Sequence, residues 1–412
     1  MQDKAGGANP SALKNVWRIH TGGNKADVVT YGSVPHPLDP DRRLTKLNFF
    51  TDDNLRFGKE ILDAGLADAN DKYLKNFRDG VSLEAPPADA GRSEITRFNR
   101  KVLAYRALLA RAGFPAPASL KEAYCKGLFN AELRKALAES KDDENGEHKS
   151  AAALLGNERI SWAQAAQAME ALHDFIKRGK DTGYDKFNQE YINDPKRSGE
   201  PWADQEFRNV IGMFEYRNGP AFVGRFSNQH SPTVSADYAD EIYSDLCDGR
   251  LVIIDQSAGD PEINIKAGYR IMQRIFTKHL QTFGAAKEPP KILVYIEEAH
   301  NLLPNSKEDD MRDVWVRTAK EGGKLGIGLI YSTQEVSSIQ KNILKATSNW
   351  FISHLNNNDE LRELAKYYDF AAFSGSLMRS QNKGFLRVKT LSNPYVIPVQ
   401  IHPFEVGHAV SG

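Results

Sequence analysis

The segment KILVYIEEAHNLLP, residues 291–304, decides the fold. Five apolar residues, 292–296, follow one another without a break and run directly into two carboxylates, Glu297 and Glu298. A short apolar run that ends in polar residues is typical of a β-strand buried on both faces. We therefore predict a strand over 292–296, with both acids at its carboxyl end.

Similar apolar runs flank this strand, and amphipathic stretches separate them. We predict strands at 251–254, 327–331 and 350–354, and helices over 265–280, 311–320 and 359–368. Strands that alternate with helices indicate an α/β fold with a mostly parallel sheet and helices on both faces. Residues 384–403 are expected to form two extended segments around a turn at 392–394.

The first half of the chain has a different pattern. From 53 to 206, apolar residues recur at spacings of three and four, which is typical of helices, with clear examples at 96–112, 120–137 and 161–176. Ser161 and Gln164 predict a helix N-cap with a capping box. A short strand is expected at 27–31 and a second apolar segment at 44–50.

Composition describes an ordinary folded protein. The 412 residues carry 54 Lys+Arg and 54 Asp+Glu, so the formal net charge is zero, and 41% are hydrophobic. This balance excludes global disorder and a strongly basic surface overall. The 2 cysteines exclude a disulfide framework. No apolar run approaches the roughly 18 residues of a membrane span, and the N-terminus lacks a secretory signal. We expect a cytoplasmic protein.

The two acids are the first candidate site. Ligands of open parallel sheets bind beyond the carboxyl ends of the strands. In nucleoside triphosphatases, one acid holds Mg²⁺ and a second polarises the attacking water, roles that we give to Glu297 and Glu298 respectively. A solvated acidic turn remains the alternative. His300 completes no HExxH motif, so we expect it to be structural or to support a neighbouring site residue rather than to bind a metal.

Polar residues around the next strand extend this site. Thr333 and Gln334 follow it and could reach a terminal phosphate or the attacking water. Arg317, Lys320 and Lys324 lie before it, around a Gly-Gly turn. These cations could meet a phosphate of their own or a neighbouring subunit, or simply stabilise a helix C-terminus. A basic group in the tail could contact DNA, although a solvated charged face is the simpler interpretation: Arg379, Lys383, Arg387 and Lys389.

Four segments, in this order, resemble the ATPase core of HerA-type DNA translocases, in the HerA/FtsK branch of RecA-like motors. They are LVIIDQSAGDPEIN (251–264), VYIEEAHNLLP (294–304), VWVRTAKEGGKLGIGLIYSTQEVSSI (314–339) and SNWFISHLNN (348–357). The similarity is strongest over 249–404 and weaker over 14–245. It is closest to the HerA proteins of bacterial defence operons.

The resemblance implies a RecA-like core that hydrolyses ATP with Mg²⁺. It implies a homo-oligomeric ring, usually a hexamer, around double-stranded DNA, with a nuclease or defence effector as partner and no membrane. By position, Glu297 and Glu298 match the Walker B acids and Gln334 the sensor residue, with Thr333 beside the nucleotide. The family commonly has an Arg where this chain has Gly323, which leaves Arg317 and Lys324 as candidates for the cation that acts in trans.

One departure from the family is at the front of the chain. No GxxxxGK[ST] phosphate loop occurs, because Gly58-Lys59, Gly179-Lys180 and Gly323-Lys324 are each followed by the wrong residue. We expect a chain that begins inside the motor, lacks the N-terminal barrel and phosphate loop, and binds ATP poorly by itself. Residues 1–52 would be a remnant of the N-terminal half of the core, 53–206 a helical insertion domain, and 207–404 the C-terminal half with its tail.

Two other functions remain open. One is a non-hydrolysing assembly subunit that keeps the ring interface. The other is a motor for conjugative or secretory transfer, which would have partners at a membrane.

Overall fold

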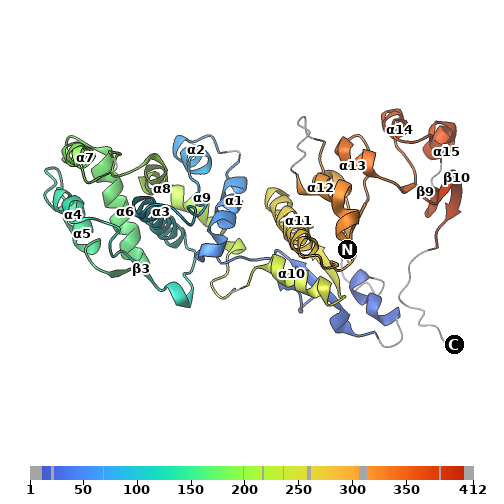
Figure 1. Ribbon diagram of the computed structural model, residues 1–412, viewed down its shortest axis with the longest axis horizontal. Coiled ribbons are helices and arrows are strands. Elements are labelled where there is room, and N and C mark those ends of the chain that lie inside the picture. Colours follow the sequence, from blue (N-terminus) through green and yellow to red (C-terminus); the bar gives the residue numbers. More distant parts are fainter. Residues whose placement is uncertain are drawn as a thin grey trace. The chain divides into compact units, whose positions relative to one another are not determined.

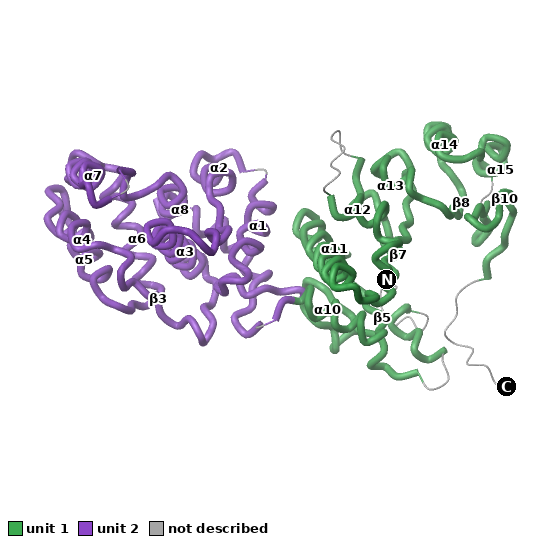
Figure 2. Tube along the Cα trace, viewed as in Figure 1, with its two compact units in different colours: residues 1–44, 238–412 green, residues 45–237 purple. Residues whose placement is uncertain are grey.

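The computed structural model describes residues 12–19, 23–67, 69–197, 199–215, 218–234, 236–257, 261–305, 313–379 and 382–402. The chain divides into two compact units (Figure 2). Unit 1 contains residues 1–44 and 238–412, and unit 2 contains residues 45–237. Each unit is described by itself.

Unit 1 alternates strands with helices (Figure 1). Its strands are β1 (Val28–Gly32), β2 (Arg43–Leu44), β5 (Leu251–Asp255), β6 (Ile292–Ile296), β7 (Ile327–Tyr331), β8 (Trp350–Ile352), β9 (Phe385–Thr390) and β10 (Asn393–Gln400). Its α-helices are α10 (Tyr238–Cys247), α11 (Pro261–Gly284), α12 (Val314–Glu321), α13 (Lys341–Ala346), α14 (Asn358–Ala365) and α15 (Ser374–Arg379). Its 3-10 helices are η1 (Leu13–Ile19), η2 (Lys25–Asp27), η6 (Ala299–Asn301), η7 (Gly322–Leu325) and η8 (Ala371–Phe373).

The strands of unit 1 form three small sheets. In the order β2-β1-β5 and in the pair β6-β7 all neighbours are parallel, whereas β10-β9-β8 is antiparallel. The mixed α/β fold with parallel strands predicted from the sequence is therefore confirmed. The parallel arrangement predicted for the strand at 350–354 is wrong, because its neighbour is β9 of a hairpin and not a strand reached by a crossover. The segment at 44–50 contributes only the end of β2 to a sheet.

The β6-β7 pair is covered on one face only, as far as the described residues go. Residues that pair in register share a face, so Leu293, Tyr295 and Ile330 lie together. These three side chains are 65%, 57% and 47% exposed. On the opposite face, Ile292 and Ile327 are buried, and α12 and η7 pack against β7. This differs from the expectation of helices on both faces.

Unit 2 is built almost entirely of helices. They are α1 (Leu55–Gly65), α2 (Lys72–Asp79), α3 (Arg92–Arg111), α4 (Ala131–Ala138), α5 (Glu147–Leu154), α6 (Trp162–Lys177), α7 (Tyr184–Asn193), α8 (Gln205–Glu215) and α9 (Gly219–Gly224), with 3-10 helices η3 (Asp52–Asn54), η4 (Ala118–Leu120) and η5 (Ser227–Gln229). The helices α3, α6 and α8 pack on one another around buried aromatic side chains.

Two details of unit 2 test the sequence patterns. The capping box at the start of α6 is confirmed, since Ser161 Oγ accepts from the Gln164 amide and Gln164 Oε1 accepts from the Ser161 amide. The helix predicted over 120–137 is wrong in its first part. There β3 (Glu122–Tyr124) pairs antiparallel with β4 (Arg159–Ser161) and buries Ala123, so a tertiary pairing overrides the local helical pattern.

Among the described residues, no helix combines the length and the apolar character that crossing a membrane requires.

Candidate functional site

Backbone hydrogen bonds fix the turn that follows β6. The Ser332 amide donates to the Ile296 carbonyl at 2.8 Å, and the Ala299 amide donates to the Ser332 carbonyl at 2.8 Å. The parallel ladder therefore continues beyond both strands. Residues 297 and 298 are held between these two bonds, at the carboxyl edge of the sheet where ligands of parallel sheets bind.

Glu298 has an unusual backbone conformation. Its φ of 49° and ψ of 53° lie in the left-handed region, which residues with a Cβ enter at a cost of order 1–3 kcal/mol. This turn brings the carboxylate to the next strand, where Glu298 Oε1 accepts a hydrogen bond from Gln334 Nε2 at 2.8 Å. The two residues that the sequence places at neighbouring strand tips are thus in contact.

The second oxygen of Glu298 is left without a hydrogen bond. Oε2 is buried but accepts no hydrogen bond from the described residues, and His300 Nδ1 lies 3.5 Å away without a hydrogen bond to it. A carboxylate oxygen without a donor can accept a proton from water, whereas Oε1 is fixed by Gln334. His300 lies beside the Glu298 carboxylate, and the structural or supporting role expected for it stays a prediction.

Glu297 does not take part in this contact. Its side chain is exposed and makes no hydrogen bond or ion pair within the described ranges. Those ranges also contain no cluster of three or more His, Cys, Asp or Glu that could hold a metal ion. A lone carboxylate fits Mg²⁺, which is usually bound by one or two carboxylates, water and substrate phosphates.

Thr333 is engaged in its own turn. Its hydroxyl donates to the Glu335 carbonyl at 3.1 Å and accepts from the Glu335 amide at 3.0 Å. These bonds shape the loop that carries Gln334. The structure records no contact between the Thr333 hydroxyl and either acid.

Arg317 and Lys324 lie elsewhere in unit 1. The Arg317 guanidinium stacks 4.4 Å from the centre of the Phe276 ring and lies 3.6 Å from Glu321. Lys324 belongs to η7, which leads into the amino end of β7, whereas Gln334 follows its carboxyl end. A five-residue strand is about 17 Å long, so Lys324 cannot serve the Glu298 carboxylate of its own subunit.

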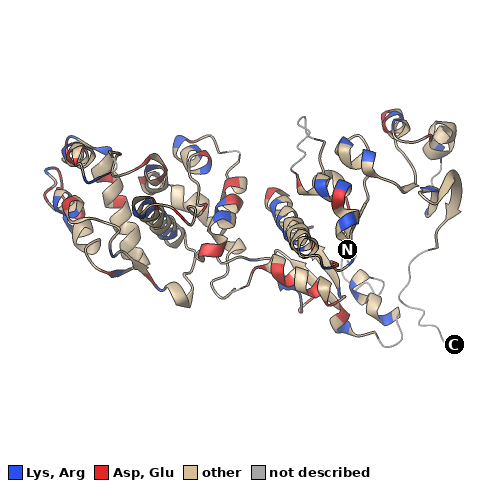
Figure 3. Ribbon diagram, in the orientation of Figure 1, with Lys and Arg blue, Asp and Glu red and all other residues tan. Residues whose placement is uncertain are grey.

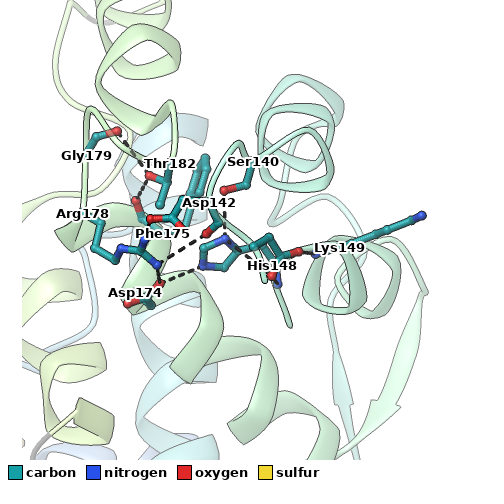
Figure 4. Close-up of polar contacts among 10 residues, drawn as sticks. Ser140, Asp142, His148, Lys149, Asp174, Phe175, Arg178, Gly179 and Thr182 are labelled. Carbon is teal, nitrogen blue, oxygen red and sulfur yellow. Dashed lines mark hydrogen bonds and ion pairs between the residues drawn. The ribbon is translucent and has the colours of Figure 1, made fainter. Parts of the chain in front are cut away.

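A second polar cluster, in unit 2, was missed by sequence reasoning (Figure 4). His148 Nδ1 lies 2.9 Å from Ser140 Oγ, and His148 Nε2 lies 3.0 Å from Asp174 Oδ2. The same Asp174 oxygen accepts from Arg178 Nη1 at 3.1 Å. The set contains a hydroxyl, an imidazole and a carboxylate, as hydrolases use, but the ring is only 3% exposed. The hydrogen bond between His148 and Asp174 connects α5 to α6, so we interpret the cluster as structural.

An ion pair between Asp255, the last residue of β5, and Arg42, the residue before β2, was also missed. Arg42 Nη2 donates to Asp255 Oδ2 at 2.8 Å, and the Arg42 side chain packs over Gly32. Burial would raise the pKa of Asp255, but hydrogen bonds from Ser257 and the charge of Arg42 outweigh it and lower the pKa. No local pattern in the sequence indicates this pairing, because its partners are more than 200 residues apart.

Comparisons with known proteins find partial similarity. No protein-family model matches the chain. The DNA double-strand break repair helicase HerA of Pyrococcus furiosus is 36% identical over 72 residues, which is 18% of this chain and 13% of that helicase. The genome packaging NTPase B204 of Sulfolobus turreted icosahedral virus 2, solved with ATP-gammaS and with AMP, is 15% identical at a TM-score of 0.28 in both cases. That match covers 36% of this chain and 66% of the viral protein, and a TM-score this low carries no inference.

Proposed function

We propose that this chain is part of an ATP-driven, DNA-handling motor of the HerA type, with a RecA-like core. The observation that carries the proposal is the contact between Glu298 and Gln334 at the tips of two parallel strands. The partial similarity to an archaeal HerA helicase supports the family. We further propose a ring of identical subunits, six by the resemblance, that moves on double-stranded DNA with a nuclease or defence effector as partner, in DNA processing or phage defence.

The chemistry follows from the geometry of the two side chains. Glu298 Oε2 accepts the proton of the water that attacks the terminal phosphate, while Gln334 holds the carboxylate through Oε1. Gln334 keeps its own amide oxygen for the same water. Glu297 is the residue that would hold Mg²⁺, and the metal would supply positive charge to the phosphates. Thr333 borders the nucleotide, and Arg317 or Lys324 acts on the nucleotide of a neighbouring subunit.

The absence of GxxxxGK[ST] from the 412 residues favours a second candidate. In it the chain is an assembly subunit that completes a ring without hydrolysing ATP. Both candidates predict that the chain assembles into a ring, but only the motor hydrolyses ATP. The test must therefore measure both ATP turnover and oligomer size.

The test measures phosphate release with and without duplex DNA, and oligomer size by sedimentation. It is run on this chain and on any longer product that its gene encodes with an in-frame GxxxxGK[ST]. We expect DNA-stimulated turnover in the form that has the phosphate loop, and its loss, by at least about 100-fold, in Glu298→Gln because the general base is gone. Glu335→Gln removes a carboxylate from the same loop and is the matched control.

Turnover that survives in Glu298→Gln would refute the role of the general base. Equal loss in Glu335→Gln would show that negative charge at the loop, and not the base, matters. Ring assembly with no turnover in any form would establish the assembly subunit.

A further inference from the structure

Two buried polar atoms face each other beside the end of β6, with no hydrogen bond between them. They are Oε2 of Glu298 and Nδ1 of His300, which lie 3.5 Å apart. Neither atom makes a hydrogen bond with any other described residue. A buried polar atom that has lost its water and gained no partner costs free energy, so most such atoms in folded proteins are paired. This juxtaposition indicates that the two atoms are each other's partners.

The backbone around His300 is anchored. The amide of Leu303 donates to the Ala299 carbonyl at 2.8 Å, and the amide of Gln340, the residue before α13, donates to the Leu303 carbonyl at 3.0 Å. Ala299 and Leu303 are themselves buried. The position of the His300 backbone is therefore fixed, and rotation of its side chain is what can change the distance from Nδ1 to Glu298.

The chemistry of the two groups decides which ring nitrogen carries the proton. A carboxylate oxygen only accepts hydrogen bonds, whereas each ring nitrogen of histidine either donates or accepts. If Nδ1 of His300 were bare, two lone pairs would face each other at 3.5 Å. With the proton on Nδ1 the same pair attracts, and a small rotation of the ring brings the two atoms to the usual length of an N–H···O bond.

No lysine or arginine takes this place. Figure 3 shows blue positions on α12 and α13 of the same unit. Among the described residues, however, no Lys or Arg lies at ion-pair distance from the Glu298 carboxylate. Arg317 of α12 lies 3.6 Å from Glu321 instead. Within the described ranges, the basic group that lies against Glu298 is therefore the imidazole of His300.

We propose that His300 is a positioning residue for Glu298, with Nδ1–H of its ring donating to Oε2 while Gln334 donates to Oε1. With both oxygens held, the plane of the carboxylate is fixed. Each carboxylate oxygen has about two acceptor sites, so Oε2 keeps one for the water of the proposed reaction. The hydrogen bond rests on the geometry, whereas its importance for turnover rests on the proposed function.

The first test observes the His300 ring directly, in this chain without nucleotide. Histidine is labelled with nitrogen-15, and long-range proton–nitrogen NMR spectra at about pH 8, where free histidine is neutral, show which ring nitrogen carries the proton. Because the chain has 10 histidines, the signal of His300 is identified by its absence from His300→Asn. We expect the proton on Nδ1. This preference should disappear in Glu298→Gly, which removes the carboxylate without straining the left-handed turn.

Glu335→Gln is the matched control, because it removes a carboxylate from the neighbouring loop, where Glu335 accepts from Ser338, and leaves Glu298 in place. The control should leave the His300 signal unchanged. A proton on Nε2 with Nδ1 bare would overturn the proposal. A signal that Glu298→Gly does not move, or that the control moves equally, would overturn it as well.

A second test measures the consequence for turnover in the form that hydrolyses ATP. The amide nitrogen of Asn is attached to Cγ, as Nδ1 of histidine is, whereas that of Gln lies one bond further out. His300→Asn should therefore keep most of kcat, and His300→Gln should lower kcat by about 10-fold with KM unchanged, since the base is misplaced. Equal kcat in the two variants would overturn the positioning role. If no form turns over although the proton lies on Nδ1, the proposed function fails and the hydrogen bond stands.

Discussion

Unit 2 and unit 1 bury their apolar residues to very different extents. Among the large apolar side chains of the described residues that remain exposed, only Ile95 and Tyr124 belong to unit 2. All the others lie in unit 1, including those on β6, β7, β8 and β10. A helix satisfies its own backbone and needs partners for one stripe of side chains, whereas a strand needs neighbours at both edges and on both faces. The sheet-forming unit is therefore the one that leaves more apolar surface exposed among the described residues.

The largest expected effect compares one phenylalanine from each unit. Phe175 of α6 is fully buried and packs against His148 and Tyr184, whereas Phe351 of β8 is 61% exposed. Phe175→Ala should lower the free energy of unfolding of unit 2 by about 3–5 kcal/mol because it leaves a cavity. Phe351→Ala should change the free energy of unfolding of unit 1 by less than about 0.5 kcal/mol.

Urea denaturation of the full chain, followed by hydrogen exchange of amides in α6 and β8, measures the two effects separately. Equal losses from the two substitutions would mean that Phe351 is covered in solution, and the contrast between the units would fail.

A smaller effect tests the charge network that ties α2, α6 and α8 together. Glu215 accepts hydrogen bonds from Tyr73 at 2.9 Å, from His173 at 2.7 Å and from Lys177. Burial would raise the pKa of Glu215, but these bonds lower it from 4.5 to about 2. The ionised form therefore stabilises unit 2 above about pH 4.5, and this contribution disappears as pH falls towards 2.

Glu215→Gln should cost about 1 kcal/mol at neutral pH, and the difference from the unmodified chain should vanish near pH 2. Thermal unfolding at a series of pH values measures it. Glu170→Gln, whose carboxylate is half-exposed and 3.6 Å from Arg111, is the control and should show little change. A difference that persists at low pH would show that packing, and not charge, is lost.

The smallest effect concerns the backbone of Glu298 in unit 1. Glycine adopts a φ of 49° without a Cβ clash, so Glu298→Gly should be about 1 kcal/mol more stable than Glu298→Ala. Hydrogen exchange of the β6 amides gives the local stability of both variants. If Ala proves as stable as Gly, the left-handed turn is not strained, and the inference that Glu298 is held in a costly conformation is wrong.

Local patterns predicted the parallel strands of unit 1 and placed Glu298 and Gln334 at neighbouring strand ends. The apolar runs 292–296 and 327–331 form β6 and β7, as predicted, because a short, uninterrupted apolar run is typical of a buried strand. Parallel pairing then brings Glu298 to Gln334, as their places after successive strands predict. The capping box of Ser161 could also be predicted from the sequence, because it depends on two residues only three positions apart.

Interactions between distant segments could not be read from the sequence. The antiparallel partner of β8 is β9, some 35 residues later, and β3 exists only because β4 lies beside it. The cluster around His148 and the pair of Arg42 with Asp255 depend on tertiary contacts in the same way. The left-handed turn at Glu298 had no signal either, because glutamate is an unexpected residue for that conformation.

The apolar stripe of Leu293, Tyr295 and Ile330 has a practical consequence for anyone who handles the protein. Sulfate and phosphate salts are excluded from protein surfaces and strengthen the burial of such side chains. A storage buffer rich in these anions would drive molecules together through the stripe and precipitate them. Dilute chloride buffers with little added salt suit a molecule that presents tyrosine and leucine to water.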